Sequence, residues 1–274
     1  MKKMVNRQSL AISNWSSDKI INTFQRNIFK YAFSAYLIIT VAFYLYLIGN
    51  SSTIITKLFA IVLLVVLILF FYLKYLYRLS VQAIISENLN LSKYLSIYEY
   101  QASHGRKTLR ELDKNNLYLV KSNVHYLRGN FEASLSALYQ CDFSKLKKRQ
   151  KIQSEHFRLT IFMLIALALK NEELISQFET ELSASNLVSK FKVPLEERYF
   201  VLKDLFLKGK SNDYYETKEA KNRLEHITFT YYRAINAQLK GDEVRARALF
   251  ESIQDEPDEL FYVREAKQYL EGDQ

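Results

Sequence analysis

The side chains that most often carry catalysis or metal binding are scattered along this sequence. Two of the four histidines directly follow a glutamate, in the pairs Glu155-His156 and Glu225-His226. Neighbouring residues of a helix point about 100° apart, so neither pair forms a metal-binding face. Cys141 is the single cysteine, which excludes an internal disulfide and a four-cysteine zinc site. The sequence therefore predicts neither a metal nor a disulfide.

Three motifs that mark common enzyme classes are also missing from the sequence. It contains no glycine-rich phosphate loop, no Gly-x-Ser-x-Gly elbow and no His-Glu-x-x-His zinc helix. Glu172-Glu173 and Glu196-Glu197 begin predicted helices, where the helix dipole favours acidic residues. We therefore expect no catalytic residue, no cofactor and no enzyme, and we keep a membrane-bound enzyme only as the third hypothesis.

Two other sets of side chains are candidates for binding. One is a basic cluster that could contact anionic lipid or an acidic partner, at about 1 kcal/mol per base near a charged membrane; the alternative is a solvated loop. Its members are Lys145, Lys147, Lys148, Arg149 and Lys151. The other is a set of paired tyrosines that could line a groove for a peptide or a helix, the alternative being ordinary core positions. These are Tyr214, Tyr215, Tyr231 and Tyr232.

The elements that position these residues begin with two uncharged apolar runs, 31–48 and 58–73. A helix needs about 20 mostly apolar residues to cross a bilayer. We therefore predict two transmembrane helices, about 31–49 and 54–76, joined by the short polar turn Gly49-Asn50-Ser51-Ser52-Thr53. A cleaved signal peptide is the competing interpretation, but the first run starts late, is too long and is followed at once by the second.

The distribution of charge predicts the orientation of this hairpin. The first 30 residues carry one acid, Asp18, against six bases, which are Lys2, Lys3, Arg7, Lys19, Arg26 and Lys30. Lys74 and Arg78 follow the second run, so the positive-inside rule places both termini in the cytoplasm. The net charge of +9 is thus largely a topology signal, and we predict no binding to nucleic acid. The compact anchor suits a bacterial plasma membrane.

The basic N-terminal segment, 1–30, has two interpretations. Ser17 could cap a short helix that lies on the inner membrane surface, with Ile20, Ile21, Phe24 and Ile28 on one face. The alternative is a disordered basic tail.

From residue 115 onward the apolar residues recur at intervals of three and four, which predicts helices and no strands. Four turns, Gly129-Asn130, Lys170-Asn171, Gly209-Lys210 and Gly241-Asp242, follow one another at intervals of about 41, 39 and 32 residues. Such periods are typical of stacked helix hairpins. We expect pairs at about 152–170 with 172–186, 195–208 with 213–225 and 226–239 with 242–254, and a last helix at 258–271.

Two segments resemble tetratricopeptide repeats in their turn glycine and in the small and aromatic positions around it. The resemblance rests on Ala234, Gly241, Ala246, Phe250 and Ile253, and on Tyr118, Ser122, Gly129, Phe131, Ser134, Leu138 and Cys141. It implies a helical solenoid that binds a peptide or helix in a concave groove and has no chemistry of its own.

The whole chain is therefore predicted to be an all-α protein with a two-helix transmembrane hairpin and a tetratricopeptide-like solenoid. We expect a basic segment (1–30), two spans (31–77), a helical connector (78–114), favoured as the cap of the stack, and a repeat domain (115–274). The predicted function is a membrane-anchored adaptor or scaffold that binds a protein partner and membrane lipid. The alternative is a self-associating structural or immunity-type protein, a homo-oligomer acting through its hairpin.

Overall fold

Every regular element that the structure describes is a helix. The computed structural model describes residues 2–49, 53–105 and 109–272, and within these ranges it contains no strand. The predicted all-α class is confirmed. The chain divides into two compact units, 1–97 and 98–274, and the division falls inside the segment that we expected to be a connector.

The first unit begins with three short helical elements that pack against one end of a long helix. They are α1 (Lys2–Ser13), α2 (Ser17–Ile20) and the π-helix η1 (Ile21–Ile28), and the long helix is α4 (Thr53–Ser86). The N-terminal segment is thus helical and not a disordered tail. Ser16, one residue before the predicted cap, accepts a hydrogen bond from the Lys19 backbone N–H at 3.2 Å.

The apolar face of this N-terminal segment is buried in protein. Ile20, Ile21 and Phe24 are buried, and the Phe24 ring lies 5.3 Å from the Tyr77 ring of α4. Two buried serines, Ser13 on α1 and Ser80 on α4, belong to the same core. The 1–30 segment therefore folds onto the end of α4 that follows the apolar run.

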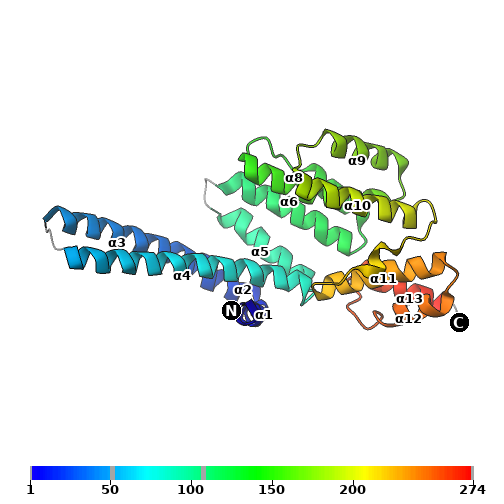
Figure 1. Cartoon of the computed structure of the whole chain (residues 1–274), viewed down its shortest axis with the longest axis horizontal. Helices are drawn as coiled ribbons and strands as arrows, with labels where there is room; N and C mark the ends of the chain where they lie inside the picture. The colour runs from blue at the N-terminus through cyan, green and yellow to red at the C-terminus, as the bar shows by residue number, and fades with distance from the viewer. Residues whose placement is uncertain (1, 50–52, 106–108, 273–274) are drawn as a thin grey trace. The chain divides into compact units, whose positions relative to one another are not determined.

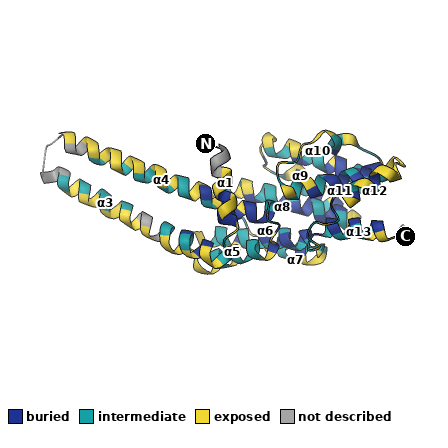
Figure 2. Cartoon of the chain, turned by 90° about the horizontal axis from the view of Figure 1, so that it is seen from below, coloured by how far each residue is buried: buried dark blue, intermediate teal, exposed yellow. Residues whose placement is uncertain are grey.

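Helices α3 (Phe29–Gly49) and α4 run side by side along the apolar runs (Figure 1). The rings of Phe43 and Phe59 stack between them, 4.6 Å apart and nearly parallel. Figure 2 shows that both helices are mostly exposed over this length. In the described residues one helix, 57–86, is long and apolar enough to cross a membrane, and the apolar part of α3 is shorter, at 34–46. Residues 50–52 of the predicted turn lie outside the described residues.

Helix α4 does not end at the apolar run but continues to Ser86 as a helix with a buried stripe. Leu89 then has a φ of 54°, and α5 (Leu91–His104) begins after this break. Helix α5 ends at His104, inside the segment expected to be a helical connector.

The second unit is a set of antiparallel helix hairpins. Helix α6 pairs with α7, α8 with α9, and α11 with α12, while α10 packs between α8 and α11. Their bounds are α6 (Arg110–Leu127), α7 (Phe131–Tyr139), α8 (Lys148–Ala168), α9 (Glu172–Ala184), α10 (Ser189–Phe206), α11 (Arg223–Leu239), α12 (Glu243–Glu251) and α13 (Phe261–Gly272).

The four predicted turns all contain a residue in the left-handed region of φ. The values are 71° at Gly129, 50° at Lys170, 59° at Gly209 and 75° at Gly241. This conformation ends a helix and returns the chain, and glycine adopts it most easily. The side chains of Asn171 and Asp242, immediately after two of these residues, then cap α9 and α12.

Small buried residues let the paired helices approach closely. Ser122 of α6 and Ser134 of α7 are fully buried, and the Ser134 hydroxyl donates to the Ser122 carbonyl at 2.6 Å. Ala234 and Ala246 occupy the corresponding places between α11 and α12 and are also fully buried. The small positions singled out in the sequence therefore lie at the helix–helix contacts of both hairpins.

The first hairpin of this unit also contacts the last helix, so the array closes on itself. Arg128, at the end of α6, forms an ion pair with Glu259. Arg264 of α13 donates to the Arg128 carbonyl at 2.7 Å, and the rings of Phe131 and Phe261 lie 5.4 Å apart. These contacts join residues more than 120 positions apart, and an open solenoid would leave its two ends apart.

One expected helix is missing. The sequence predicts a helix at 213–225 that pairs with 195–208, but residues 213–222 form only the 3₁₀ turn η3 (Asp213–Thr217) and an irregular segment, and α11 begins at Arg223. Arg233 of α11 donates to the carbonyl oxygens of Tyr215 and Lys218, at 2.8 and 2.6 Å. A helix would use these carbonyls itself, so the arginine favours the irregular segment.

Candidate functional site

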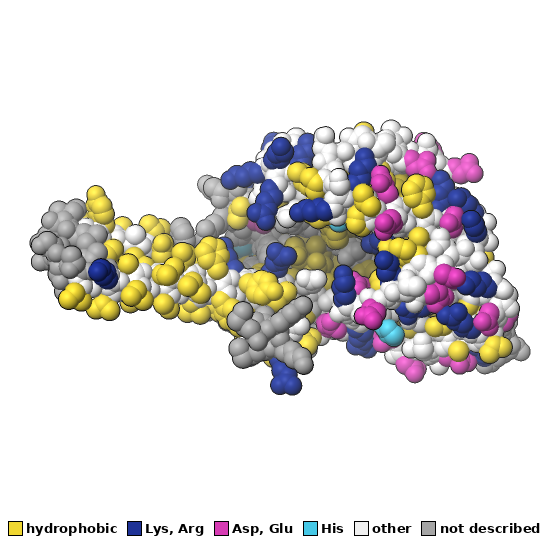
Figure 3. Space-filling view, viewed as in Figure 1, with side chains coloured by type: hydrophobic (Ala, Val, Ile, Leu, Met, Phe, Trp, Pro, Cys, Tyr) yellow, Lys and Arg dark blue, Asp and Glu magenta, His cyan; other side chains and the backbone are white. Residues whose placement is uncertain are grey.

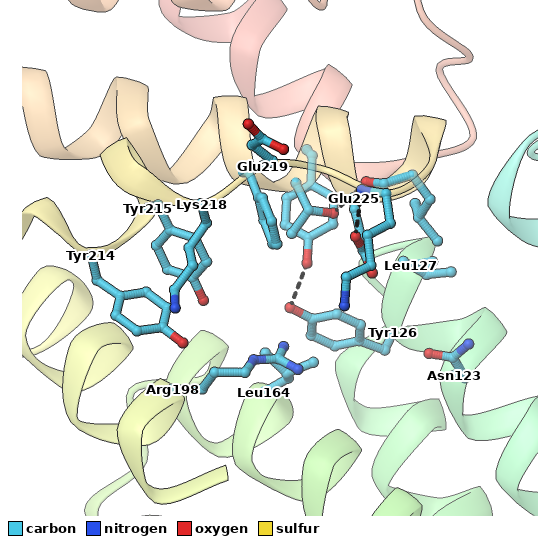
Figure 4. A pocket seen from close by; sticks show the side chains of 15 residues that line it. Asn123, Tyr126, Leu127, Leu164, Arg198, Tyr214, Tyr215, Lys218, Glu219 and Glu225 are labelled. Atoms are coloured by element: carbon cyan, nitrogen blue, oxygen red, sulfur yellow. Dashed lines mark hydrogen bonds between the residues drawn. The ribbon is translucent and has the colours of Figure 1, made fainter. Parts of the chain in front are cut away.

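The irregular segment after η3 covers a pocket of about 390 Å³ inside the second unit (Figure 4). Helices α6, α8, α10, α11 and α13 supply the other walls. The lining residues used below are Asn123, Tyr126, Arg198, Tyr215, Lys218 and Tyr262. This volume is in the range of small-molecule binding sites.

A polar network on α11 fixes the cover of the pocket. Buried Asn236 accepts a hydrogen bond from the Asn212 backbone N–H at 2.7 Å and donates to the Asp213 carboxylate at 2.9 Å. The Asn212 side chain in turn accepts from the Tyr214 backbone N–H at 3.1 Å. Together with Arg233, this network orients η3 so that Tyr214 and Tyr215 face Arg198 across the pocket (Figure 4).

Three buried tyrosines from three helices meet at the pocket wall. The hydroxyls of Tyr126 and Tyr262 are 3.0 Å apart, and those of Tyr232 and Tyr262 are 3.3 Å apart. Burial raises the pKa of all three well above the ordinary value of tyrosine. They are therefore neutral hydroxyls at neutral pH, able both to donate and to accept.

Arg198 supplies the positive charge of this pocket. Its side chain points into the pocket beside Tyr126 and Leu164 (Figure 4), and it interacts electrostatically with Tyr215, Tyr232 and Tyr262. Among the described residues no carboxylate forms an ion pair with it. A guanidinium keeps its proton in proteins, so Arg198 is a cation without an ion-pair partner among the described residues.

The structure buries most of the tyrosines proposed from the sequence. Tyr215, Tyr231 and Tyr232 are all less than 8% exposed and lie in the interior of the unit. Tyr214 is partly accessible, with the Lys218 ammonium 4.4 Å from the centre of its ring. Tyr214 and Tyr215 line the pocket around Arg198, whereas Tyr231 and Tyr232 line a second one of about 320 Å³. A binding role for the four stays a prediction.

The basic cluster lies at the start of α8 and in the loop before it. All five of its side chains are exposed, and none forms an ion pair with a described acid. The Lys147 backbone N–H donates to the Gln150 side chain at 3.2 Å, which caps the helix. The bases are therefore free to contact lipid or an acidic partner, and that role stays a prediction.

The side chains that could have carried other chemistry are not gathered into a site. In the ranges that the structure describes, no three His, Cys, Asp or Glu residues are placed to hold a metal ion. Burial raises the pKa of the Cys141 thiol to about 12, so it is unreactive at neutral pH. The His156 ring stacks on Phe191 at 4.7 Å, and burial lowers its pKa.

Sequence reasoning missed Arg198, although a signal for it exists. On α10 the buried residues Leu195, Leu202 and Leu205 recur at helical spacing, and Arg198 falls on the same stripe. A charged residue in an apolar stripe indicates either a buried partner or a ligand site.

Fold and site together define an all-helical protein with an exposed apolar helix in one unit and a donor-lined pocket in the other. Comparisons with protein-family models, with curated proteins and with solved structures gave no match.

Proposed function

We propose that this chain is a membrane-anchored adaptor: α3 and α4 cross the membrane as a hairpin, and the helical unit binds a protein partner. The observation that carries the proposal is the contrast between the surfaces of the two units. The α3–α4 surface is almost entirely hydrophobic, whereas the helices of the second unit carry mixed charge (Figure 3).

The anchor role rests on the exposed apolar surface of α4. Apolar side chains that are more than half exposed point in all directions around it: Leu58, Ile61, Val62, Leu64, Val65, Ile68, Leu69 and Phe71. Soluble monomers rarely expose contiguous apolar surface of this extent, whereas lipid solvates it. Helix α3 has 21 residues and at 1.5 Å per residue spans about 31 Å, close to the thickness of the hydrocarbon core. This length supports a second span.

The adaptor role rests on an apolar strip on α10. Val193 and Phe200 are 49% and 60% exposed, and their spacing of seven residues places them on one helix face. Aromatic side chains in such strips are common anchors for a partner helix or peptide. Membrane lipid is the second partner that we propose, through the anchor and the exposed basic cluster.

Crosslinking in intact membranes tests the adaptor role. A photoreactive phenylalanine analogue replaces Phe200 in the full chain, and the matched control carries it at Val244, which is 84% exposed on α12. We expect one protein to crosslink from position 200 and not from position 244.

A general chemical crosslinker, applied both to the full chain and to a chain ending at residue 97, separates this proposal from its alternative. If that shortened chain captures the same protein, or if position 200 captures only further copies of the chain, the adaptor proposal fails. The self-associating hairpin would then be the better account.

A further inference from the structure

Burial removes the Arg198 guanidinium from water, and the described side chains that stabilise its charge are tyrosines, which are neutral at neutral pH. Arg198 lies on the apolar stripe of α10, between Leu195 and Leu202, and no described carboxylate pairs with it. Removing a cation from water without a counter-ion destabilises the folded state. An anion that enters the pocket would relieve this penalty, so binding would be coupled to the charge of Arg198.

The tyrosine hydroxyls near Arg198 differ in whether a described residue accepts their hydrogen. The hydroxyls of Tyr126, Tyr232 and Tyr262 bond to one another, so they accept and donate within their own cluster. The Tyr215 hydroxyl is buried beside the Arg198 guanidinium, which can only donate to it, and its own O–H hydrogen has no acceptor among the described residues. The interior of the pocket therefore offers the Arg198 guanidinium and the Tyr215 O–H donor.

The other charged groups lie at the rim. Two bases, Lys218 and Lys221, are balanced by two acids, Glu219 and Glu225. The Glu225 carboxylate accepts a hydrogen bond from the Lys221 backbone N–H at 2.9 Å. The acids are thus on the cover segment and the first turn of α11, whereas Arg198 enters from α10 (Figure 4). The charge inside the pocket is positive, and its unused groups are donors.

A second, more apolar cavity of about 320 Å³ adjoins this pocket. Tyr126, Leu164 and Tyr262 line both cavities and separate them, and the second is further lined by Leu167, Leu202, Leu205 and Phe206. The pocket around Arg198 is itself lined by Leu127, Leu164, Leu224 and Phe229, so a ligand with an acceptor-rich head and an apolar body would match it.

We propose that the helical unit binds a small organic oxyanion, a carboxylate or phosphate monoester on an apolar or aromatic group, with the anionic group on Arg198. The guanidinium donates to two oxygens of the anion, and the Tyr215 hydroxyl donates to one of them. This activity goes beyond the proposed adaptor function and does not depend on it, because it needs no protein partner.

The test measures ligand-dependent thermal stabilisation and binding heat with the full chain in detergent. The probes are benzoate and phenyl phosphate, and the neutral control is benzamide, which has the shape of benzoate without its charge. We expect saturable stabilisation by at least one of the two anions and none by benzamide, and the tighter anion identifies the preferred group. No stabilisation by either anion, or equal stabilisation by benzamide, overturns the proposal.

Three variants separate a ligand site from a structural arginine. Arg198→Met should weaken anion binding roughly 10- to 100-fold, as expected for loss of a charge-assisted bidentate contact, while leaving the ligand-free melting temperature unchanged or higher. Arg198→Lys should bind with intermediate affinity, because it keeps the charge and loses the fork of donors. Arg149→Met, which removes an exposed arginine of the basic cluster, is the control and should bind as the parent chain does.

A fourth variant covers the case in which Arg198→Met does not fold. Tyr215→Phe removes a buried hydroxyl that has no acceptor for its hydrogen among the described residues, so in that case it should lower the stability of the ligand-free protein less than the loss of Arg198 does. It should weaken anion binding several-fold. Unchanged anion affinity in both Tyr215→Phe and Arg198→Lys would overturn the proposal.

Discussion

The closure of the helical array can be tested by comparing two glycines with nearly the same backbone conformation. Gly129 and Gly241 have φ values of 71° and 75°, and each ends the first helix of a hairpin. Their surroundings differ. A Cβ at Gly241 would meet no atom within 4 Å, whereas a Cβ at Gly129 would lie 3.0 Å from Phe261 Cβ and 3.0 Å from Arg264 Nη2.

The expected free energies of unfolding follow from this difference. Alanine in the left-handed region is destabilised by roughly 1–2 kcal/mol, which is the whole effect expected for Gly241→Ala. Gly129→Ala adds overpacking, typically about 1–3 kcal/mol. Phe261 Cβ is bonded to the backbone of α13, and the Arg264 guanidinium is held by the Arg128 carbonyl, so neither neighbour moves away freely.

The assay is thermal unfolding of the full chain, followed by helical circular dichroism. A change of 1 kcal/mol shifts the melting temperature by about 2–4 °C for a unit of this size. We expect Gly129→Ala to lower the melting temperature by at least twice as much as Gly241→Ala. Equal shifts would show that the α6–α7 turn does not pack against α13, and the closed arrangement would be refuted.

Three further predictions concern the turn residue Lys170, a titratable side chain and the anchor. Lys170 is a non-glycine residue at a φ of 50°, so Lys170→Gly should raise the unfolding free energy by about 0.5–1 kcal/mol in the same assay, and a decrease would contradict the turn geometry. Burial raises the pKa of the Asp113 carboxyl to about 6, so the folded state binds more protons than the unfolded state. The free energy of unfolding should therefore fall as the pH rises from about 4 to 6. Asp113→Asn should flatten this part of the stability profile. Cys141 is half-buried and its thiol is unreactive, so it should not react with a maleimide, and a single engineered cysteine can report the membrane topology. An impermeant maleimide added to intact cells should label Ser51→Cys but not Val244→Cys. The reverse pattern would contradict the predicted orientation.

Local features of the second unit could be predicted from the sequence, because they depend on neighbouring residues. The turns at Gly129, Lys170, Gly209 and Gly241 are specified by residues that adopt or follow the left-handed conformation. Buried Ala246 and Phe250 likewise follow from their spacing on one helix face.

Features that depend on distant residues could not be predicted. The replacement of a helix at 213–225 by a 3₁₀ turn requires Arg233 and Asn236 of α11, which bond to the backbone of the earlier segment. The ion pair between Arg128 and Glu259 joins opposite ends of the unit, and no local sequence pattern predicts it.

The candidate site was missed for the same reason. The hydrogen-bonded tyrosines come from α6, α11 and α13 and meet only in the folded unit. The pairs of adjacent tyrosines in the sequence instead suggested a surface groove. Arg198 could be distinguished only by its place on an apolar stripe, where it interrupts the spacing of Leu195 and Leu202.

The most direct test of the adaptor function is the location of the partner. The protein captured from position 200 is followed by quantitative fractionation in cells that make the full chain and in cells that do not. The account predicts that this protein is recovered with the membrane only when the chain is present. A membrane-bound fraction that is the same in both kinds of cell would contradict it.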